Sequence, residues 1–346
     1  MTFTNIERIT PVIGFMQAYS HTISTLKKCS RCKYVSYCNK SCQFVQLVSQ
    51  IIQKQRRYPP CTHDDEDYFP TTVDQLESHL KYARKDNIES LLCELQQLFE
   101  EDVLPEPSSL LNMYGAINCN GFSILDNDLN GIAPGIYLRA SMVNHSCDPN
   151  CQVISDGRKL QLRTVKDVTE GEECTISYVD LMDPTKERQA ELEKRYHFTC
   201  KCVKCIKEIN PDDGLGELEL RDLHWTKVLQ LCAPYLKLDS SNNLLANYYL
   251  LVRLRQEAIK VCVHIQAWDK YVEMGQLNIE SLRYHYGPYS AMLGLHLLDM
   301  GNKLLEMGRL REARKYLTEA KSVLEITHGP QHSFMMTPYV QKLLDL

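Results

Sequence analysis

The amino-acid sequence predicts an α+β protein: a β-rich core with small zinc modules, followed by an all-α domain of helical repeats. Short apolar stretches within residues 111–183 alternate with polar residues, as in half-buried strands, and Asp156-Gly157 favours the tight turn of a β-hairpin. A further strand is expected to place Cys174, Ile176 and Tyr178 on one face, and a helix is expected to start at Pro184. Cysteines recur at the spacings of zinc ligands. Helical periodicity with an internal repeat, from residue 211 to the end, indicates the all-α domain.

Length and composition are those of a globular protein. A chain of 346 residues, 44% hydrophobic and 24% charged, is expected to form about two or three domains. The net charge of −5 gives no overall attraction to nucleic acid or anionic membranes, and no apolar run approaches the roughly 20 residues that span a bilayer. Glu7 and Arg8 interrupt the apolar N-terminal stretch, so no signal peptide is expected. Fifteen cysteines, several at metal spacings, indicate a reducing compartment.

The first cysteine group lies within residues 29–61. Its members follow a CxxC-then-CxxxC spacing that has few uses besides zinc binding: Cys29, Cys32, Cys38 and Cys42. Two interpretations are open, because the four thiolates could close one local zinc site or the segment could be a metal-free remnant. Cys61 and His63 are candidates for late ligands.

Residues 62–110 are predicted to be mainly helical after a proline-rich, acidic linker. Six apolar residues recur with the period of an amphipathic helix that packs on a core: Ile88, Leu91, Leu92, Leu95, Leu98 and Phe99. Pro105 and Pro107 end this helix. His79 precedes it, and a single histidine in such a setting is more often structural than functional.

Three motifs in the middle of the chain carry the chemistry. The first is Asn-His-Ser-Cys-Asp-Pro-Asn-Cys at residues 144–151, and the second is Gly-Glu-Glu-Cys-Thr-Ile-Ser-Tyr at residues 171–178. The third is Cys-x-Cys-x-x-Cys at residues 200–205. Each alone has an ordinary explanation, such as a polar turn or a set of reduced, buried thiols. Their combination in this order is difficult to obtain by chance.

Together the three motifs resemble the SET domain of protein lysine methyltransferases, and they match best the SMYD family, which combines SET and MYND domains. The resemblance covers the chain from about Cys29 to the C-terminus. It implies transfer of a methyl group from S-adenosylmethionine to a lysine side chain of a protein, either a histone or another protein. It also implies that the first cysteine group is part of a MYND-type zinc finger.

The resemblance implies roles for individual residues. Tyr178 takes the position of the catalytic tyrosine. Six residues match positions that contact or border the methyl donor: Asn120, Asn144, His145, Tyr196, Phe198 and His79. Three aromatic residues are expected to line a channel for the substrate lysine: Phe122, Tyr178 and Tyr196. Aromatic faces attract cationic sulfonium and methylammonium groups, and a dry channel lowers the pKa of the lysine. Phe122 is an equally good candidate for an ordinary core residue.

A structural zinc site is implied beside this centre. Three ligands come from the Cys-x-Cys-x-x-Cys motif and the fourth from the first motif: Cys147, Cys200, Cys202 and Cys205. Four protein ligands leave no open position for water, so the metal would be structural and would hold Tyr196 and Phe198 over the channel. Cys151 is the competing fourth ligand.

These assignments divide the chain into six segments. They are an unassigned segment 1–28, a partial MYND-type finger 29–61, a helical SET insertion 62–110, the SET core 111–183, a post-SET zinc segment 184–210 and a TPR-like helical domain 211–346. In the last segment Gly287-Pro288 recurs as Gly329-Pro330, 42 residues later (329 − 287). Helix pairs are predicted over Trp268–Leu282 and Leu310–Ile326. Such arrays bind peptides on a concave face or pack on a neighbouring domain.

Two departures from the family pattern lie near the N-terminus, where the opening Gly-x-Gly turn and the first half of the finger are not found. They leave open an alternative function, a catalytically weak scaffold that binds partners through its helical repeats. A zinc-dependent nucleic-acid binder is disfavoured by the negative charge. We expect S-adenosylmethionine and Zn²⁺ as cofactors, a protein substrate, and peptide partners at the repeats. We expect no nucleic acid or membrane partner, and a monomer in the cytoplasm and nucleus.

Overall fold

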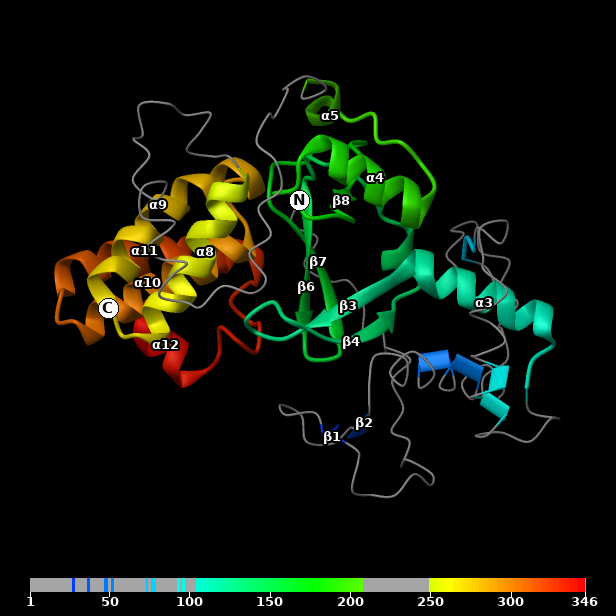
Figure 1. Ribbon diagram of the computed structural model, residues 1–346, viewed down its shortest axis with the longest axis horizontal. Coiled ribbons are helices and arrows are strands. Elements are labelled where there is room, and N and C mark those ends of the chain that lie inside the picture. Colours follow the sequence, from blue (N-terminus) through cyan, green and yellow to red (C-terminus); the bar gives the residue numbers. More distant parts are fainter. Residues whose placement is uncertain are drawn as a thin grey trace. The chain divides into compact units, whose positions relative to one another are not determined.

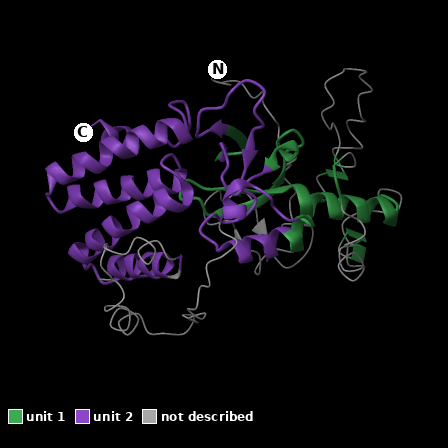
Figure 2. Cartoon of the chain, turned by 90° about the horizontal axis from the view of Figure 1, so that it is seen from above, with its two compact units in different colours: residues 1–144, 155–162, 193–198 green, residues 145–154, 163–192, 199–346 purple. Residues whose placement is uncertain are grey.

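The computed structural model describes 27–28, 36–37, 47–48, 51–52, 73, 76–78, 92–93, 95–96, 104–207 and 249–345 (Figure 1). The first cysteine group lies outside these residues, as do Cys61, His63 and His79. The chain divides into two compact units, coloured separately in Figure 2. Unit 1 comprises residues 1–144, 155–162 and 193–198, and unit 2 comprises residues 145–154, 163–192 and 199–346.

Unit 1 contains a helix followed by a hairpin. Helix α3 spans Pro107–Asn120, and its first residue is a proline, whose fixed φ suits that position. Strands β3 (Gly121–Leu125) and β4 (Gly131–Ile136) then pair antiparallel, with Gly121 opposite Ile136. The 3-10 helix η4 (Ala140–Met142) follows. Two short strands near the N-terminus, β1 (Lys27–Lys28) and β2 (Ser36–Tyr37), also pair antiparallel.

The core of unit 1 forms around α3. Leu110, Met113 and Ile117 are buried on it together with upstream residues that include Ile51 and Leu95. Leu95 belongs to the predicted amphipathic stripe and is fully buried. Gly115 permits a close approach, because a Cβ atom there would lie 2.2 Å from the carbonyl oxygen of Ser78. The helix therefore fits against the upstream segment only with glycine at this position.

The predicted hairpin around Asp156-Gly157 is present. Strands β6 (Cys151–Asp156) and β7 (Lys159–Thr164) pair, and Gly157 has a φ of 61°, which a glycine adopts without strain. The boundary between the two units passes through this hairpin. Strands β5 (Asn144–His145) and β8 (Thr175–Ile176) form another two-stranded sheet.

Two predictions about the segment around β8 need correction. The expected strand through Cys174, Ile176 and Tyr178 is only two residues long, and Tyr178 lies beyond its end. The amide of Tyr178 donates to a histidine side chain rather than to a strand, so the ladder cannot continue. Helix α4 (Thr185–Tyr196) begins one residue later than the expected start at Pro184. Helix α5 (Val203–Lys207) follows within the third motif.

The C-terminal part of unit 2 is a set of antiparallel helices (Figure 1). They are α8 (Tyr249–His264), α9 (Trp268–Tyr286), α10 (Ala291–Glu306), α11 (Leu310–Thr327) and α12 (Pro338–Leu344). Their facing sides share one apolar core. At Gly301 a Cβ atom would lie 2.6 Å from the side chain of Leu317, so glycine permits α10 to pack closely on α11. No helix in the described part of the chain is both long and apolar enough to span a membrane.

The repeated Gly-Pro turn occupies equivalent places in this domain. Gly287 follows α9 and Gly329 follows α11, and their φ angles are 83° and 81°. The last turn of α11 and the first residue of α10, next to the two turns, contact strands β7 and β6. The Arg163 Nε donates to the carbonyl oxygen of Ile326 at 2.7 Å, and the amide of Ala291 donates to Gln152 at 3.2 Å. The turns of the repeat therefore pack on the neighbouring core.

Candidate active site and metal centre

Four cysteine side chains converge in unit 2. Cys147 follows β5, whereas Cys200, Cys202 and Cys205 follow α4, and their sulfur atoms all lie within 4.8 Å of one another. The sulfurs of Cys147 and Cys205 are 3.4 Å apart. Four thiolates at this separation fit a tetrahedral zinc ion with no open coordination position. Cys151, the competing ligand, is not among the four and interacts instead with Cys174.

Helix α4 holds the third motif in place. The side-chain amide of Gln189 donates to the carbonyl oxygen of Cys200 at 2.7 Å and accepts from the amide of Cys200 at 2.8 Å. This reciprocal pair fixes the backbone of the first ligand of the motif. The amide of Cys205 donates to the sulfur of Cys202 at 3.5 Å, so the start of α5 turns toward the cluster.

The pKa values of three of these thiols are shifted, in different directions. Burial raises the pKa of Cys147, and it also raises the pKa of Cys200. Burial opposes ionisation of Cys202 as well, but the backbone amides of Cys205 and Cys147 outweigh it and lower its pKa to about 7. A metal that binds here must displace protons, since thiolates are the ligating form.

A buried arginine lies against this cluster. Arg188 on α4 is 2% exposed, and its guanidinium donates to the carbonyl oxygen of Asp183 at 2.5 Å and to the hydroxyl of Thr185 at 2.9 Å. The same group lies 3.9 Å from the sulfur of Cys205. Its fixed positive charge would offset the negative charge that four thiolates would retain after binding a divalent ion. Sequence reasoning missed Arg188, because a charged residue on a polar helix is ordinarily exposed.

His145 connects the cluster to Tyr178. The amide of Tyr178 donates to Nδ1 of His145 at 3.0 Å, so the ring proton must reside on Nε2. That Nε2 lies 3.2 Å from the sulfur of Cys147, and a thiolate there can accept its proton as a hydrogen bond. Burial, followed by the charge of Arg188, lowers the pKa of His145 to about 4 and keeps the ring neutral. The rings of His145 and Tyr178 are 5.2 Å apart between centroids.

Asn150 joins the first two motifs. Its amide group donates to the carbonyl oxygen of Glu173 at 2.9 Å, and its oxygen accepts from the amide of Thr175 at 2.8 Å. It also donates to the carboxylate of Glu172 at 3.3 Å. Asn150 is buried, so these bonds are sheltered from water. These bonds hold the second motif, 25 residues further along the chain (175 − 150), beside the first motif.

The other predicted site residues belong to unit 1: Asn120, Phe122, Asn144, Tyr196 and Phe198. Asn120 ends α3, and its amide donates to the carbonyl oxygens of Glu77 at 2.7 Å and Ala116 at 2.8 Å. Phe122 packs edge-to-face on Tyr137, with ring centroids 5.9 Å apart. The predicted donor pocket and lysine channel combine residues of both units and therefore stay predictions.

Comparisons with known proteins agree on one family. The SET domain matches residues 15–179. The rat (Rattus norvegicus) and human (Homo sapiens) proteins named "N-lysine methyltransferase SMYD2" are each 27% identical over 377 residues, covering 92% of this chain and 84% of the relative. A mouse (Mus musculus) "Histone-lysine N-methyltransferase SMYD3" is 25% identical over 355 residues, covering 90% of this chain and 82% of the relative. The SET match ends one residue beyond Tyr178.

Proposed function

Because this chain belongs to the SMYD family of SET-domain proteins, we propose that it transfers a methyl group from S-adenosylmethionine to a lysine side chain of a protein substrate. The observation that carries the proposal is the arrangement at the end of the SET match. There Tyr178 is bonded through its amide to His145 of the first motif, which in turn contacts a metal-ligand candidate. The proposed substrate is a histone or another protein with an accessible lysine.

The chemistry requires a positioned, neutral amine. S-adenosylmethionine, when bound, supplies an electrophilic methyl group on a sulfonium. The phenol of Tyr178 is half-buried and can both donate and accept a hydrogen bond, so we assign it the orientation of the incoming lysine nitrogen. Orientation of this kind is worth about several kcal/mol of a reaction barrier. We assign the exclusion of water from the lysine stem to Phe122, Tyr196 and Phe198.

The residues that contact the methyl donor are inferred from the same membership of the SMYD family. We infer that Asn120, Asn144, His145, Tyr196 and Phe198 border the donor, and that His79, outside the described residues, does so as well. The backbone of His145, whose side chain is already engaged by protein atoms, is the part we expect to serve the donor.

We propose that Cys147, Cys200, Cys202 and Cys205 hold one structural Zn²⁺. The cluster geometry and the neighbouring guanidinium of Arg188 support this ligand set. The metal would fix the segment that carries Tyr196 and Phe198 and, through His145, the backbone at Tyr178. The cytoplasm and nucleus are the compartments we propose, since these thiols must stay reduced.

The test combines donor binding with turnover. Calorimetric titration of S-adenosylmethionine into the full chain should show micromolar binding, and Tyr178→Phe should keep that binding while losing transfer to protein substrates. Tyr339→Phe, an exposed tyrosine on α12, is the matched control and should behave like the parent. Normal turnover by Tyr178→Phe would remove this residue from the catalytic role. No donor binding by a folded, zinc-loaded chain would favour the scaffold function instead.

A further inference from the structure

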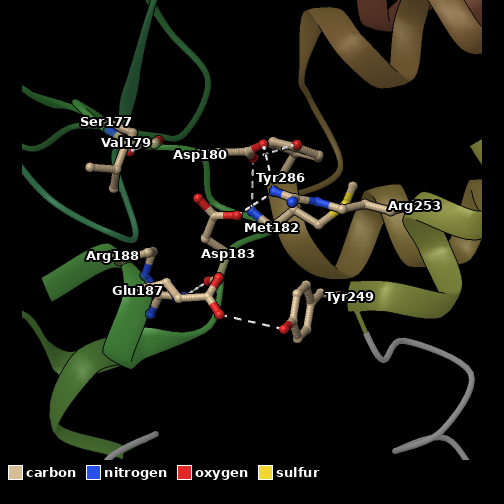
Figure 3. A network of polar contacts seen from close by, with 10 residues as sticks. All are labelled: Ser177, Val179, Asp180, Met182, Asp183, Glu187, Arg188, Tyr249, Arg253 and Tyr286. Atoms are coloured by element: carbon tan, nitrogen blue, oxygen red, sulfur yellow. Dashed lines mark hydrogen bonds and ion pairs between the residues drawn. The ribbon is translucent and has the colours of Figure 1, made fainter. Parts of the chain in front are cut away.

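The helical domain contacts the segment that directly follows Tyr178 (Figure 3). The hydroxyl of Tyr286, at the end of α9, donates to the carboxylate of Asp180 at 2.6 Å. Arg253 on α8 forms an ion pair with Asp183 and lies 3.8 Å from the carboxylate of Asp180. Both residues come from helices that lie at least 70 residues further along the chain than the carboxylates they contact.

The contacted segment has little regular structure to hold it. Strand β8 ends at Ile176 and helix α4 begins at Thr185, so Tyr178 lies on an eight-residue connection (residues 177–184). Local bonds organise it around Asp180, whose carboxylate accepts from the amide of Met182 at 3.0 Å and whose carbonyl accepts from the amide of Asp183 at 3.2 Å. Fixing Asp180 therefore fixes the turn that follows Tyr178.

An apolar contact reinforces the polar ones. Met182 is 3% exposed and belongs to the core of the helical domain, where it packs with residues such as Val252 and Leu282. The connection is thus anchored at two successive points, Asp180 by hydrogen bonds and Met182 by burial. Tyr249 of α8 adds a weaker bond to Glu187 at the start of α4, 3.4 Å long.

The ionisation states of Tyr286 and Asp183 favour a stable contact between the helical domain and the connection. Burial raises the pKa of Tyr286, and the neighbouring Asp180 carboxylate raises it further, so the phenol remains a donor across the physiological range. Burial raises the pKa of Asp183 while the guanidinium of Arg253 acts in the opposite direction. A hydrogen bond to a charged acceptor is stronger and more directional than one between neutral groups.

We propose that Tyr286 and Arg253 are positioning residues for Tyr178, so that the helical domain sets the place of the catalytic hydroxyl by holding Asp180. The proposal rests on the assigned role of Tyr178. It gives a function to Tyr286, the residue directly before the repeated Gly-Pro turn, and predicts that the helical domain acts on turnover as well as on partner binding. Neither residue is required to touch the substrate or the donor.

The experiment uses Tyr286→Phe in the full chain, with Tyr284→Phe as the matched control, because Tyr284 lies on the same helix and is 61% exposed. Hydrogen exchange measured by mass spectrometry should show the amides of Met182 and Asp183 exchanging about tenfold faster in Tyr286→Phe, with α11 unchanged. Turnover should fall about ten- to a hundredfold with little change in substrate KM, as expected when a catalytic group is displaced by about 1 Å.

The two readouts separate this proposal from the proposed function. Faster exchange in an otherwise folded protein supports the contact even if no transfer is found with any substrate, in which case only the enzymatic role fails. Exchange and turnover equal to those of Tyr284→Phe would overturn the positioning role. If Tyr286→Phe does not fold, Asp180→Asn keeps the shape of the acceptor and removes its charge. Asp180→Asn should accelerate the same two amides, and protection equal to the parent's would overturn the proposal.

Discussion

Replacement of Arg188 by methionine tests how the buried guanidinium supports the cysteine cluster. Methionine keeps the unbranched shape of the side chain and its burial but removes the charge and the donors. The carbonyl of Asp183 and the hydroxyl of Thr185 then lose bonds of 2.5 and 2.9 Å. The sulfur of Cys205 loses a cation 3.9 Å away.

The magnitude follows from these three contacts. Each of the two neutral acceptors loses about 1 kcal/mol of net hydrogen bonding, so the free energy of unfolding of the zinc-loaded protein should fall by about 2 kcal/mol. Partners that surround metal ligands typically change metal affinity by about ten- to a hundredfold when removed. The long distance to Cys205 places the expected loss of zinc affinity near the lower value, about tenfold.

Competition between the protein and a chromogenic zinc chelator measures the affinity, and thermal unfolding of the loaded protein measures the stability. Lys194→Met on the exposed side of α4 is the matched control and should leave both quantities unchanged. Arg188→Lys retains a positive charge but not the two-pronged geometry of a guanidinium. Its zinc affinity and stability should therefore lie between those of the parent and those of Arg188→Met. Equal zinc affinity in Arg188→Met and Lys194→Met, with both folded, would refute the reasoning.

Three further predictions concern packing, pH and the link between motifs. Gly301→Ala should lower the free energy of unfolding by about 1–3 kcal/mol, because its Cβ would lie 2.6 Å from Leu317; an unchanged denaturant midpoint would contradict this. Because burial raises the pKa of the Cys147 and Cys200 thiols, zinc binding must release at least their two protons. Affinity should therefore weaken by about a hundredfold or more per unit of falling pH, and titrations in buffers of different ionisation enthalpy count the protons. Asn150→Ala removes three hydrogen bonds and should destabilise the folded chain by about 2–4 kcal/mol in urea unfolding, whereas a change below about 0.5 kcal/mol would show that the bonds are dispensable.

Sequence reasoning grouped the four cysteines of the cluster and preferred Cys147 as the fourth metal ligand, but it left Cys151 as a competitor. Cys147 and Cys151 lie four residues apart in one motif, and both have the right chemistry. The structure places Cys147 at the cluster because it follows β5, whereas Cys151 begins β6 and interacts with Cys174. Only the fold distinguishes two equivalent thiols at such close spacing.

The residues proposed to position Tyr178 carried no local signal. Asp180, Arg253 and Tyr286 look like ordinary polar residues of a turn, a helix and a helix end, and their importance comes from partners far away in sequence. The length of β8 was overestimated for a related reason. Alternating apolar residues suggested a strand through Tyr178, but the amide of that residue bonds to the side chain of His145. Periodicity reports burial and does not report which group accepts a backbone hydrogen bond.

The spacing of the metal ligands has a consequence for how the chain matures. Cys147 and Cys200 are 53 residues apart (200 − 147), and the ring that a bound ion would close contains β6, β7, β8 and Tyr178. Closing such a ring in a flexible chain costs about 3.5 kcal/mol of entropy, which metal coordination would offset only once both ends have met. Zinc binding would then be a late step in the folding of a newly made chain. The supply of the ion in the cell would set the share of newly made chains that become competent enzymes.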